Sequence, residues 1–434
     1  MENNQKKLKF PNGFLWGTST SAYQVEGGIT NDWSEWEAKR VKSKKFKNKK
    51  LNPNDYICGK ACDSYNRYEE DLDLAKSLNT NAVRFGIEWA RIEPKKGVWD
   101  VAEIKHYAQV LAATKKRGLK TVVTLWHWTN PAWIAKAGGW ANKETVTRYL
   151  RYVDLIVNEL GGNIDYWVTL NEPMLLANYG YFLGYFPPNR HSFFKFKKAT
   201  KNLINAHIGA YKKIHEYFPN AQVSITNLSN HFEPNKKWFF PDVMLKKIVA
   251  YYGINKFFNE INNYIDYIGV DYYRRIHLTL IPPFIKRKKE NITDMGWEIY
   301  PEGIYHVLKY LSKFKKPIII LENGLADADD SRRAEFIKKH LYFVHKAIED
   351  GVDVRGYFHW SLLDNFEWDK GYAPKFGLFA VDRKTFERKA RLSAEVYGEI
   401  CKTNSINFCT GISIPPLNKI NHHVNAVFYS SDLK

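Results

Sequence analysis

The stretch Lys120–Trp128, KTVVTLWHW, decides the fold of this 434-residue chain. It opens with β-branched residues, a composition typical of a buried strand, and it ends in the polar His127 beside Trp128. Seven further stretches are equally rich in Val, Ile, Thr and aromatic residues. They are Phe14–Thr20, Asn81–Trp89, Asp165–Asn171, Gln222–Asn227, Tyr267–Tyr273, Pro317–Glu322 and Val354–Ser361.

Helical periods separate these strand candidates. Tyr68–Leu78, Ile304–Phe314 and Arg333–Ile348 repeat apolar residues every three to four positions. Thr145–Leu160 does the same, with an apolar face made of Val146, Tyr149, Leu150, Val153 and Ile156. Strands that alternate with helices indicate a parallel sheet. Eight such units predict the α/β class and a single (β/α)₈ TIM barrel, with its active site at the C-terminal ends of the strands.

The length suits one such barrel with loop insertions, and no linker divides the chain. Residues 1–402 are therefore expected to form one catalytic domain. Residues 403–434 are polar, with weak periodicity and a Pro415–Pro416 break. We expect them to be a C-terminal tail of unknown role.

The charge of the chain is strongly positive, with a formal net value of +19 and lysine-rich runs at 44–50, 195–198 and 286–289. Such an excess fits nucleic acid, an anionic membrane or an acidic polymer as partner. The runs are scattered and match no nucleic-acid-binding motif, so a solvated lysine surface is the favoured interpretation. We expect neither a specific nucleic acid nor a membrane as partner, and the sequence does not reveal the oligomeric state.

The N-terminus, MENNQKKLKF, lacks the apolar run of a signal peptide, and no long apolar stretch predicts a membrane span. The expected location is the cytoplasm, where Cys58, Cys62, Cys401 and Cys409 would be reduced thiols. Cys58 and Cys62 have no partner at zinc-type spacing, so no metal is expected. We expect no cofactor either.

Polar side chains stand at nearly every predicted strand end, where they would face one barrel mouth. Among them are two carboxylates, Glu172 after the fourth strand and Glu322 at the end of the seventh. Glycosidic hydrolysis needs two carboxyl groups, one to protonate the departing oxygen and one to attack or stabilise the anomeric carbon. Trp, His, Gln and Asn at the other ends supply the aromatic faces and hydrogen-bonding groups that hold a sugar.

Six ordered sequence blocks, followed by FGL at Phe376, resemble glycoside hydrolase family 1, the β-glucosidase family. They extend the match over most of the chain, from about Phe10 to Cys401. The blocks are FLWGTSTSAYQVEG (14–27), TLWHWTNP (124–131), TLNEP (169–173), GWEIYPEG (296–303), ILENG (320–324) and WSLLDNFEW (360–368).

The resemblance implies a retaining β-glycosidase, most simply a β-glucosidase, with Glu172 as catalytic acid/base and Glu322 as nucleophile. Arg84 and Tyr273 would keep the nucleophile ionised and oriented. Asn171 would hold the sugar 2-hydroxyl, and Trp297 would line the leaving-group side. The resemblance further assigns a group of residues to the sugar itself: Gln24, His127, Trp128, Trp360, Glu367, Trp368 and Phe376.

Two residues depart from the family pattern. Leu321 precedes the nucleophile where Thr is usual, a change expected to affect only local packing. Asp271 stands where Asn is usual, two residues before Tyr273. If Asp271 is ionised close to Glu322, repulsion should raise the pKa of the nucleophile. The alternative is that Asp271 points away and pairs with Arg274 or Arg275.

Other activities remain open at this point. A transglycosylase would use the same covalent intermediate and the same residues. A phospho-β-glycosidase replaces the region around Glu367 with Ser and adds Lys and Tyr, whereas Glu367 would repel a phosphate. A non-catalytic carbohydrate-binding or nucleic-acid-binding protein would not need both carboxylates. The sequence does not distinguish glucose, galactose, fucose and mannose, nor does it identify the aglycone.

Overall fold

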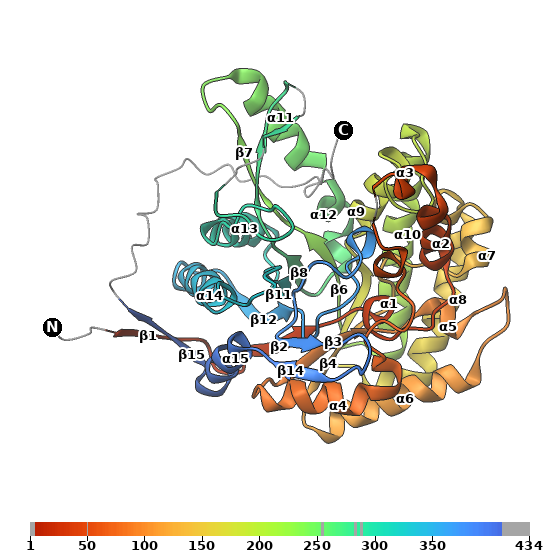
Figure 1. Cartoon of the computed structure of the whole chain (residues 1–434), viewed down its shortest axis with the longest axis horizontal. Coiled ribbons are helices and arrows are strands. Elements are labelled where there is room, and N and C mark those ends of the chain that lie inside the picture. Colours follow the sequence, from red (N-terminus) through yellow and green to blue (C-terminus); the bar gives the residue numbers. More distant parts are fainter. Residues whose placement is uncertain (1–4, 50, 253–255, 282–283, 287–289, 410–434) are drawn as a thin grey trace.

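A computed structural model of the chain describes residues 5–49, 51–252, 256–281, 284–286 and 290–409. Its centre is a closed barrel of eight strands, all parallel, which confirms the predicted (β/α)₈ fold (Figure 1). Each strand lies within, or within one residue of, a stretch that the sequence predicted. The strands are β2 (Leu15–Ser19), β3 (Ala82–Gly86), β4 (Lys120–Thr124), β5 (Tyr166–Asn171), β6 (Gln222–Leu228), β8 (Ile268–Asp271), β11 (Ile318–Asn323) and β12 (Val354–Trp360).

The strands are rich in apolar residues because both of their faces are buried. Val83, Val123 and Trp167 belong to the large apolar cluster between barrel and helices. Their chain neighbours point to the opposite face, as successive strand residues must, and form a separate small cluster. That second cluster consists of Leu15, Ala82, Val122, Val168, Tyr267, Ile319, Leu321 and Phe358. Leu321 is fully buried in this cluster, in line with a packing role for that departure from the family pattern.

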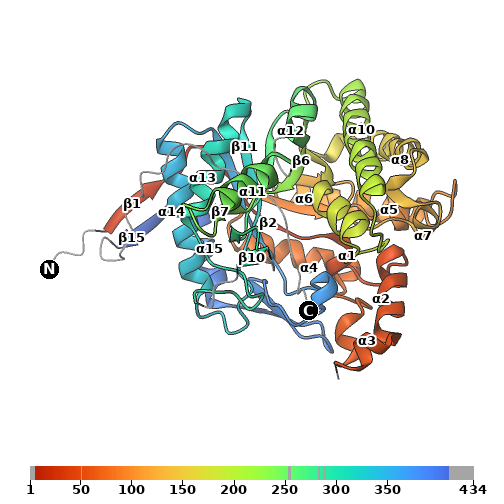
Figure 2. The ribbon, with the colours of Figure 1, turned by 90° about the horizontal axis from the view of Figure 1, so that it is seen from above.

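Helices surround the barrel, as Figures 1 and 2 show. In α8 the apolar stripe that the sequence predicted is buried at Tyr149, Val153 and Ile156. Amphipathic periodicity therefore decides which side of the helix faces the strands. The longer helices of this layer are α4 (Ser64–Ser77), α6 (Val101–Lys116), α8 (Glu144–Leu160), α10 (Phe193–Tyr217), α13 (Glu302–Leu311), α14 (Arg333–Glu349) and α15 (Leu392–Thr403).

Insertions after the strands build the C-terminal face of the barrel. Two of them, after β6 and after β8, together form a small sheet with the strand order β10-β9-β7, in which β7 and β9 are parallel. The segment after β6 carries β7 (His231–Pro234), α11 (Phe240–Ala250) and α12 (Lys256–Ile261), and the segment after β8 carries β9 (Arg275–Leu278) and β10 (Ile285–Lys286). The other insertions carry α1 (Ala22–Val25), α2 (Asp32–Lys42), α3 (Lys44–Lys47), α5 (Trp89–Ile92), α7 (Ala132–Lys136), α9 (Pro173–Leu176), β13 (Phe379–Val381) and β14 (Arg388–Ala390).

The two ends of the described chain pair with each other outside the barrel. β1 (Gln5–Lys9) runs antiparallel to β15 (Ser405–Cys409) (Figure 1). Asn404 extends this contact, because its side-chain amide donates to the Phe10 carbonyl at 2.9 Å. The segment expected to be a polar tail thus begins with a strand, and residues 410–434 lie outside the described residues.

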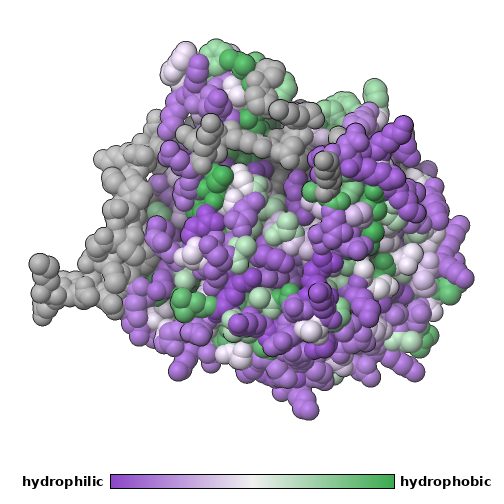
Figure 3. All heavy atoms as spheres, viewed as in Figure 1, coloured by the Kyte–Doolittle hydropathy of each residue, from purple (hydrophilic) through white to green (hydrophobic). Residues whose placement is uncertain are grey.

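The surface in Figure 3 is mostly hydrophilic, with separate apolar areas. Within the part of the chain that the structure describes, none of the helices has both the length and the apolar composition needed to cross a bilayer.

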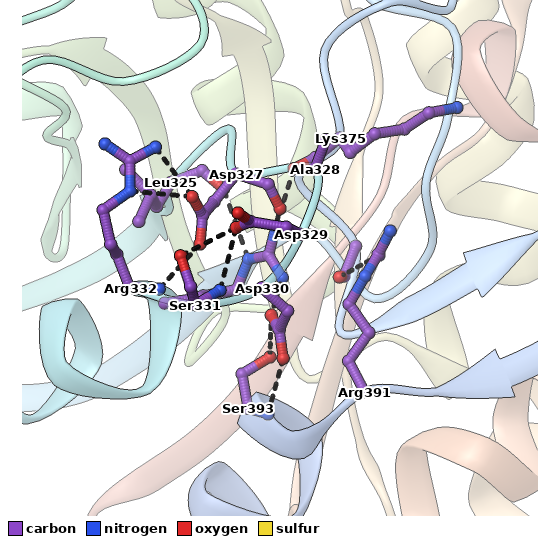
Figure 4. A network of polar contacts seen from close by, with 12 residues as sticks. Leu325, Asp327, Ala328, Asp329, Asp330, Ser331, Arg332, Lys375, Arg391 and Ser393 are labelled. Atoms are coloured by element: carbon purple, nitrogen blue, oxygen red, sulfur yellow. Dashed lines mark hydrogen bonds and ion pairs between the residues drawn. The ribbon is translucent and has the colours of Figure 1, made fainter.

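A network of polar contacts holds the loop that follows β11 (Figure 4). The fully buried Arg333 guanidinium donates to the carbonyls of Leu325, Asp327 and Lys375 and pairs with Asp330. The other oxygen of Asp330 accepts from the backbone amide of Ser393 at 2.9 Å. The network therefore joins this loop to the loop before β13 and to the start of α15.

The Asp330→Ala variant should lower the free energy of unfolding by about 3 kcal/mol, because it leaves the buried Arg333 charge without its carboxylate. Denaturant titration followed by circular dichroism measures this change. The matched control is Asp329→Ala, since the exposed Asp329 side chain bonds only to Ser331. Equal stability of the two variants would show that Asp330 does not compensate Arg333.

Candidate active site

Glu172 follows β5 on a sharply turned backbone. It has left-handed dihedral angles, with φ 40° and ψ 53°, and Pro173 begins α9 directly after it. Its amide donates to the carbonyl and the hydroxyl of Thr226 at 3.1 and 3.2 Å. Two bonds to the next strand thus fix the backbone of this carboxyl group at the C-terminal face of the barrel.

Glu322 lies near the end of β11, opposite Asp271 of β8. Arg84, which is buried on β3, donates from Nη1 to Glu322 Oε1 at 2.5 Å. The Tyr273 hydroxyl donates to Glu322 Oε2 at 2.7 Å. Both contacts favour the ionised carboxylate, because a cation and a hydrogen bond to the charged form each stabilise it.

Three carboxyl groups meet at this point. One oxygen each from Glu172, Asp271 and Glu322 lie within 4.8 Å of one another, and all three residues are buried. Neither oxygen of Asp271 has a hydrogen-bond partner among the described residues. The alternative that Asp271 pairs with Arg274 or Arg275 is therefore wrong: Asp271 faces the other two acids, and Arg275 bonds to Glu298.

The surroundings of Asp271 and Glu172 shift the pKa of both carboxyl groups. Burial, followed by the charge of Glu322, raises the pKa of Asp271 well above its ordinary value. Burial, followed by the charges of Asp271 and Glu322, raises the pKa of Glu172 in the same direction. Glu322 differs from both in its contacts, because Arg84 and Tyr273 each bond to it. Glu172 therefore keeps its proton to a higher pH than an ordinary glutamic acid does.

Three carboxylate oxygens at this spacing resemble the ligand set of a hard cation. Here the positive charge comes from Arg84, which already bonds to one oxygen of Glu322, while Tyr273 bonds to the other. These two donors account for the close approach of the acids, and no metal ion is needed to explain the cluster.

Gln24 and Glu367 stand together beside the acids. The Gln24 amide nitrogen donates to the Phe366 carbonyl at 2.8 Å and to Glu367 Oε2 at 3.3 Å. Burial raises the pKa of Glu367 to about 8, with smaller contributions from Glu322 and Asp369. At neutral pH the Glu367 carboxyl can therefore donate as well as accept a hydrogen bond, which suits a sugar hydroxyl.

His127 and Trp128 offer donors that bond to nothing else. His127 Nε2 lies 3.0 Å from the Asn171 amide nitrogen and accepts from it, so the proton is assigned to Nδ1. Burial, followed by the charge of Arg84, lowers the pKa of His127 well below its ordinary value, and the ring is neutral. Among the described residues His127 Nδ1 and Trp128 Nε1 have no hydrogen-bond partner. These two buried donors are therefore available to a polar ligand.

Aromatic rings form two groups around these polar side chains. Trp368 stacks on His127 with 5.7 Å between ring centroids, and Trp360 lies 6.3 Å from the same imidazole. Beside Glu322, Trp297 and Phe376 each contact the Tyr273 ring. Both groups offer apolar faces of the kind that hold a pyranose.

The structure brings together all the residues that the sequence assigned to the site. Two other acids that also stand after predicted strands lie elsewhere, since Glu26 bonds to Arg91 and Tyr107, and Glu88 bonds to Thr129. Sequence reasoning missed Thr226, whose hydroxyl donates to Asn171 Oδ1 at 2.7 Å. Its place near the end of the fifth predicted strand was the available signal. It also missed Trp33, which packs against Trp368. Trp33 stands at no predicted strand end, so nothing in the sequence marked it as a site residue.

Comparison with known proteins agrees with this geometry. The family model "Glycosyl hydrolase family 1" matches residues 6–261 and 243–406. Beta-glucosidase A of Thermotoga maritima is 32% identical over 445 aligned positions, which cover 92% of this chain and 99% of that protein. A beta-galactosidase of Sulfolobus acidocaldarius is 31% identical, with 92% and 96% covered.

Solved structures match over the same range. A beta-glycosidase from Pyrococcus horikoshii superposes with a TM-score of 0.85 at 37% identity, covering 92% of this chain and 96% of that one. Beta-glucosidase from Thermotoga maritima in complex with castanospermine gives a TM-score of 0.83 at 29% identity, with 92% and 99% covered.

The Asp271→Asn variant should move the basic limb of the pH profile of kcat/KM for a chromogenic β-glycoside to lower pH, by roughly one unit. An ionised Asp271 raises the pKa of Glu172, and an amide cannot. Glu172 therefore loses its proton at lower pH in the variant, and the rate falls sooner. Superimposed basic limbs would contradict the coupling between Asp271 and Glu172.

Proposed function

This chain belongs to glycosyl hydrolase family 1, and we propose that it is a β-glucosidase that hydrolyses terminal β-D-glucosyl residues with retention of configuration. One observation carries the proposal: Glu172 and Glu322 have carboxylate oxygens within 4.8 Å of each other. Retaining enzymes place their two carboxyl groups about 5–5.5 Å apart, whereas inverting enzymes leave about 6.5–9.5 Å for a water molecule.

In the first step a Glu322 carboxylate oxygen attacks the anomeric carbon. The bond from that carbon to the glycosidic oxygen breaks, and Glu172 gives its proton to the departing oxygen, so the aglycone leaves as an alcohol. The products are a glycosyl ester on Glu322 and an ionised Glu172. Arg84 and Tyr273 orient the nucleophile, and both are already bonded to its carboxylate in the free enzyme.

In the second step Glu172 takes a proton from water, and the resulting hydroxide attacks the same carbon. The ester bond to Glu322 breaks, and its carboxylate is released. The change of role at Glu172 follows from electrostatics. The Glu322 charge is among the causes that raise the pKa of Glu172, and esterification removes that charge. The pKa of Glu172 is therefore lower in the intermediate, so Glu172 stays ionised there and can take a proton from water. Release of the Glu322 carboxylate then raises the pKa of Glu172 again.

The sugar would be held by the groups whose hydrogen bonds are incomplete. His127 Nδ1 and Trp128 Nε1 would donate to hydroxyl oxygens, and Gln24 with Glu367 would bind the far side of the ring. Asn171 would bond the 2-hydroxyl. Trp360, Trp368 and Phe376 would enclose the glycone, and Trp297 would line the leaving-group side.

Two alternatives share this machinery. Transglycosylation uses the same intermediate, with a sugar or alcohol in place of water, and the residues of the site do not discriminate between the two. A 6-phosphorylated glycone would meet the buried carboxyl of Glu367. Because burial raises the pKa of Glu367 to about 8, repulsion from this residue is weaker at neutral pH than the sequence suggested. The site still offers phosphate an acid where phosphate binding needs a cation.

We further propose that the enzyme works in a reducing compartment, as the cytoplasm is. The supporting observation comes from the cysteines. Cys58 and Cys62 are buried free thiols that donate to the carbonyls of Tyr23 and Asp364 at 3.1 Å each. Burial also raises the pKa of both thiols, which keeps them protonated and unreactive.

All the residues assigned to catalysis or sugar binding lie between Gln24 and Phe376. We therefore propose that residues 1–402 form the catalytic domain. Pairing of β1 with β15 ties the start of the following segment to this domain. No role is assigned to residues 403–434.

Glu322→Ala should reduce kcat on an aryl β-glucoside by about 10⁵–10⁶-fold, the scale of loss when a nucleophile is removed. Glu172→Ala should keep turnover on substrates with good leaving groups when azide is present, because such groups need little protonation. The anomer formed first, followed by NMR, should be β for the wild type. A first-formed α-anomer, or equal azide-insensitive loss in both variants, would refute the assignment.

A panel of aryl β-glycosides tests the glycone. The β-glucoside should be cleaved, and the 6-phospho-β-glucoside should have a kcat/KM at least about 100-fold lower, because the phosphate would meet the buried carboxyl of Glu367. Glu367→Gln should raise KM for the β-glucoside. Preferred cleavage of the phosphorylated substrate would identify a phospho-β-glycosidase instead.

A further inference from the structure

Exposed apolar side chains are concentrated in the two neighbouring insertions that follow β6 and β8. Eight of the sixteen large hydrophobic residues that are exposed in the described chain lie between residues 238 and 284. Trp238 is 78% exposed and Phe240 is 70% exposed. We call this group the apolar platform: Trp238, Phe240, Ile248, Tyr251, Tyr252, Leu280, Ile281 and Phe284.

The apolar platform has a fixed structure, because hydrogen bonds to a buried side chain hold its two loops together. Asp242 is fully buried near the start of α11, and it accepts from the backbone amides of Lys236 and Leu280 at 3.2 and 2.9 Å. Pro234 of β7 lies opposite Leu278 of β9 in the parallel sheet. The loop with Trp238 and the loop with Leu280 therefore emerge from the same end of that sheet.

α11 presents its apolar residues on two sides. Leu245 and Val249 pack against the protein core. Phe240, Ile248 and Tyr251 lie on the other side, at helical positions i, i+8 and i+11, and are exposed. A surface helix is expected to be polar on its outer side. In Figure 3, green surface lies over α11 at the top of the molecule, with purple surface beside it.

The exposed charges of the platform are almost all positive. Lys236, Lys237, Lys247 and Lys286 are exposed among the apolar side chains. Asp242 is buried, and Glu233 is half-buried 3.6 Å from Arg275, so of the nearby acids only Glu233 acts on these lysines, through its charge interaction with Lys237. Within the described residues 231–286, the exposed acid is Glu260, on α12.

The exposed apolar area and the lysines around it indicate which kind of partner binds the platform. We propose that the apolar platform binds the surface of an anionic lipid bilayer, with Trp238 and Phe240 at the headgroup boundary and the lysines on anionic headgroups. Interfacial binding combines buried aromatic area with attraction between Lys and anionic lipid. A second copy of a chain with net charge +19 would bring like charges together. Residues 410–434 contain two lysines and one aspartate, so they too lack the complementary charge.

The platform stands on the same face as Glu172 and Glu322, because β7 follows β6 and the Leu280 loop follows β9, which itself follows β8. Peripheral binding of this kind needs no membrane-spanning helix. It also assigns a function to the lysines of the platform, whereas the sequence analysis interpreted the net positive charge as a solvated lysine surface. The proposal does not depend on the catalytic roles given above.

Cosedimentation of the full-length protein with sucrose-loaded vesicles tests the proposal. Vesicles of phosphatidylcholine with phosphatidylglycerol should bind the protein, vesicles of phosphatidylcholine alone should bind it far less, and added salt should release it. Trp238→Ser/Phe240→Ser and Lys236→Gln/Lys237→Gln should each reduce the partition coefficient at least about 10-fold. Unchanged hydrolysis of a soluble aryl glycoside would confirm that these variants fold.

Two matched variants control for loss of an aromatic ring and of charge. Tyr217→Ser removes an exposed ring at the end of α10, on the opposite end of the barrel, and Lys198→Gln/Lys201→Gln removes two exposed charges from α10. Both should bind vesicles like the wild type. Equal binding to neutral vesicles, absence of binding, or equal losses in the controls would overturn the proposal. A dimer in light scattering that Trp238→Ser/Phe240→Ser abolishes would overturn it in favour of a second copy.

Discussion

Arg84 lies buried inside the barrel and donates to Thr124, Asn171 and Glu322, which belong to three different strands. It is the cation in contact with a cluster of three acids, and its effect on each depends on distance and bonding. Glu322 receives a direct bond, while Asp271 receives none. The same charge also lowers the pKa of His127, which leaves a neutral ring with a free donor. One guanidinium thus acts differently on groups that are only a few ångströms apart: it bonds to Glu322 directly, while burial outweighs its effect on the pKa of Glu172 and Asp271.

The barrel explains why such a cluster can form at all. Parallel strands end at one face, and each brings the residues at its C-terminal end to the same place. Asn171 and Glu172 arrive on β5, Asp271 on β8 and Glu322 on β11. Residues distant in the sequence meet because the closed sheet fixes their positions, and the Arg333 network holds the loop after Glu322 in turn.

Much of this arrangement could be predicted from the sequence, because it depends on local patterns. β-Branched runs located the eight strands, and the polar residue at each end located the mouth. The neighbours of a side chain could not be predicted in this way. Asp271 was visible as an unusual residue, but whether it faced Glu322 or Arg275 depends on the register of β8 and β11, which is a tertiary property. Pairing of β1 with β15 escaped prediction for the same reason, since the two strands are separated by nearly the whole chain.

The small sheet beneath the apolar platform is also bonded to the residue that follows Trp297. Glu298 follows Trp297 directly, and it bonds to Arg275 and His277 of β9. Although burial opposes its ionisation, the bonds from His277 and Arg275 lower the pKa of Glu298 to about 2. The pair is therefore ionic at any pH at which the enzyme works, and it joins Trp297 to the small sheet. Any movement of that sheet must move Trp297, whose ring contacts Tyr273, which in turn donates to the nucleophile. The small sheet and the reacting carboxylate are thus linked through a short chain of packed and bonded groups.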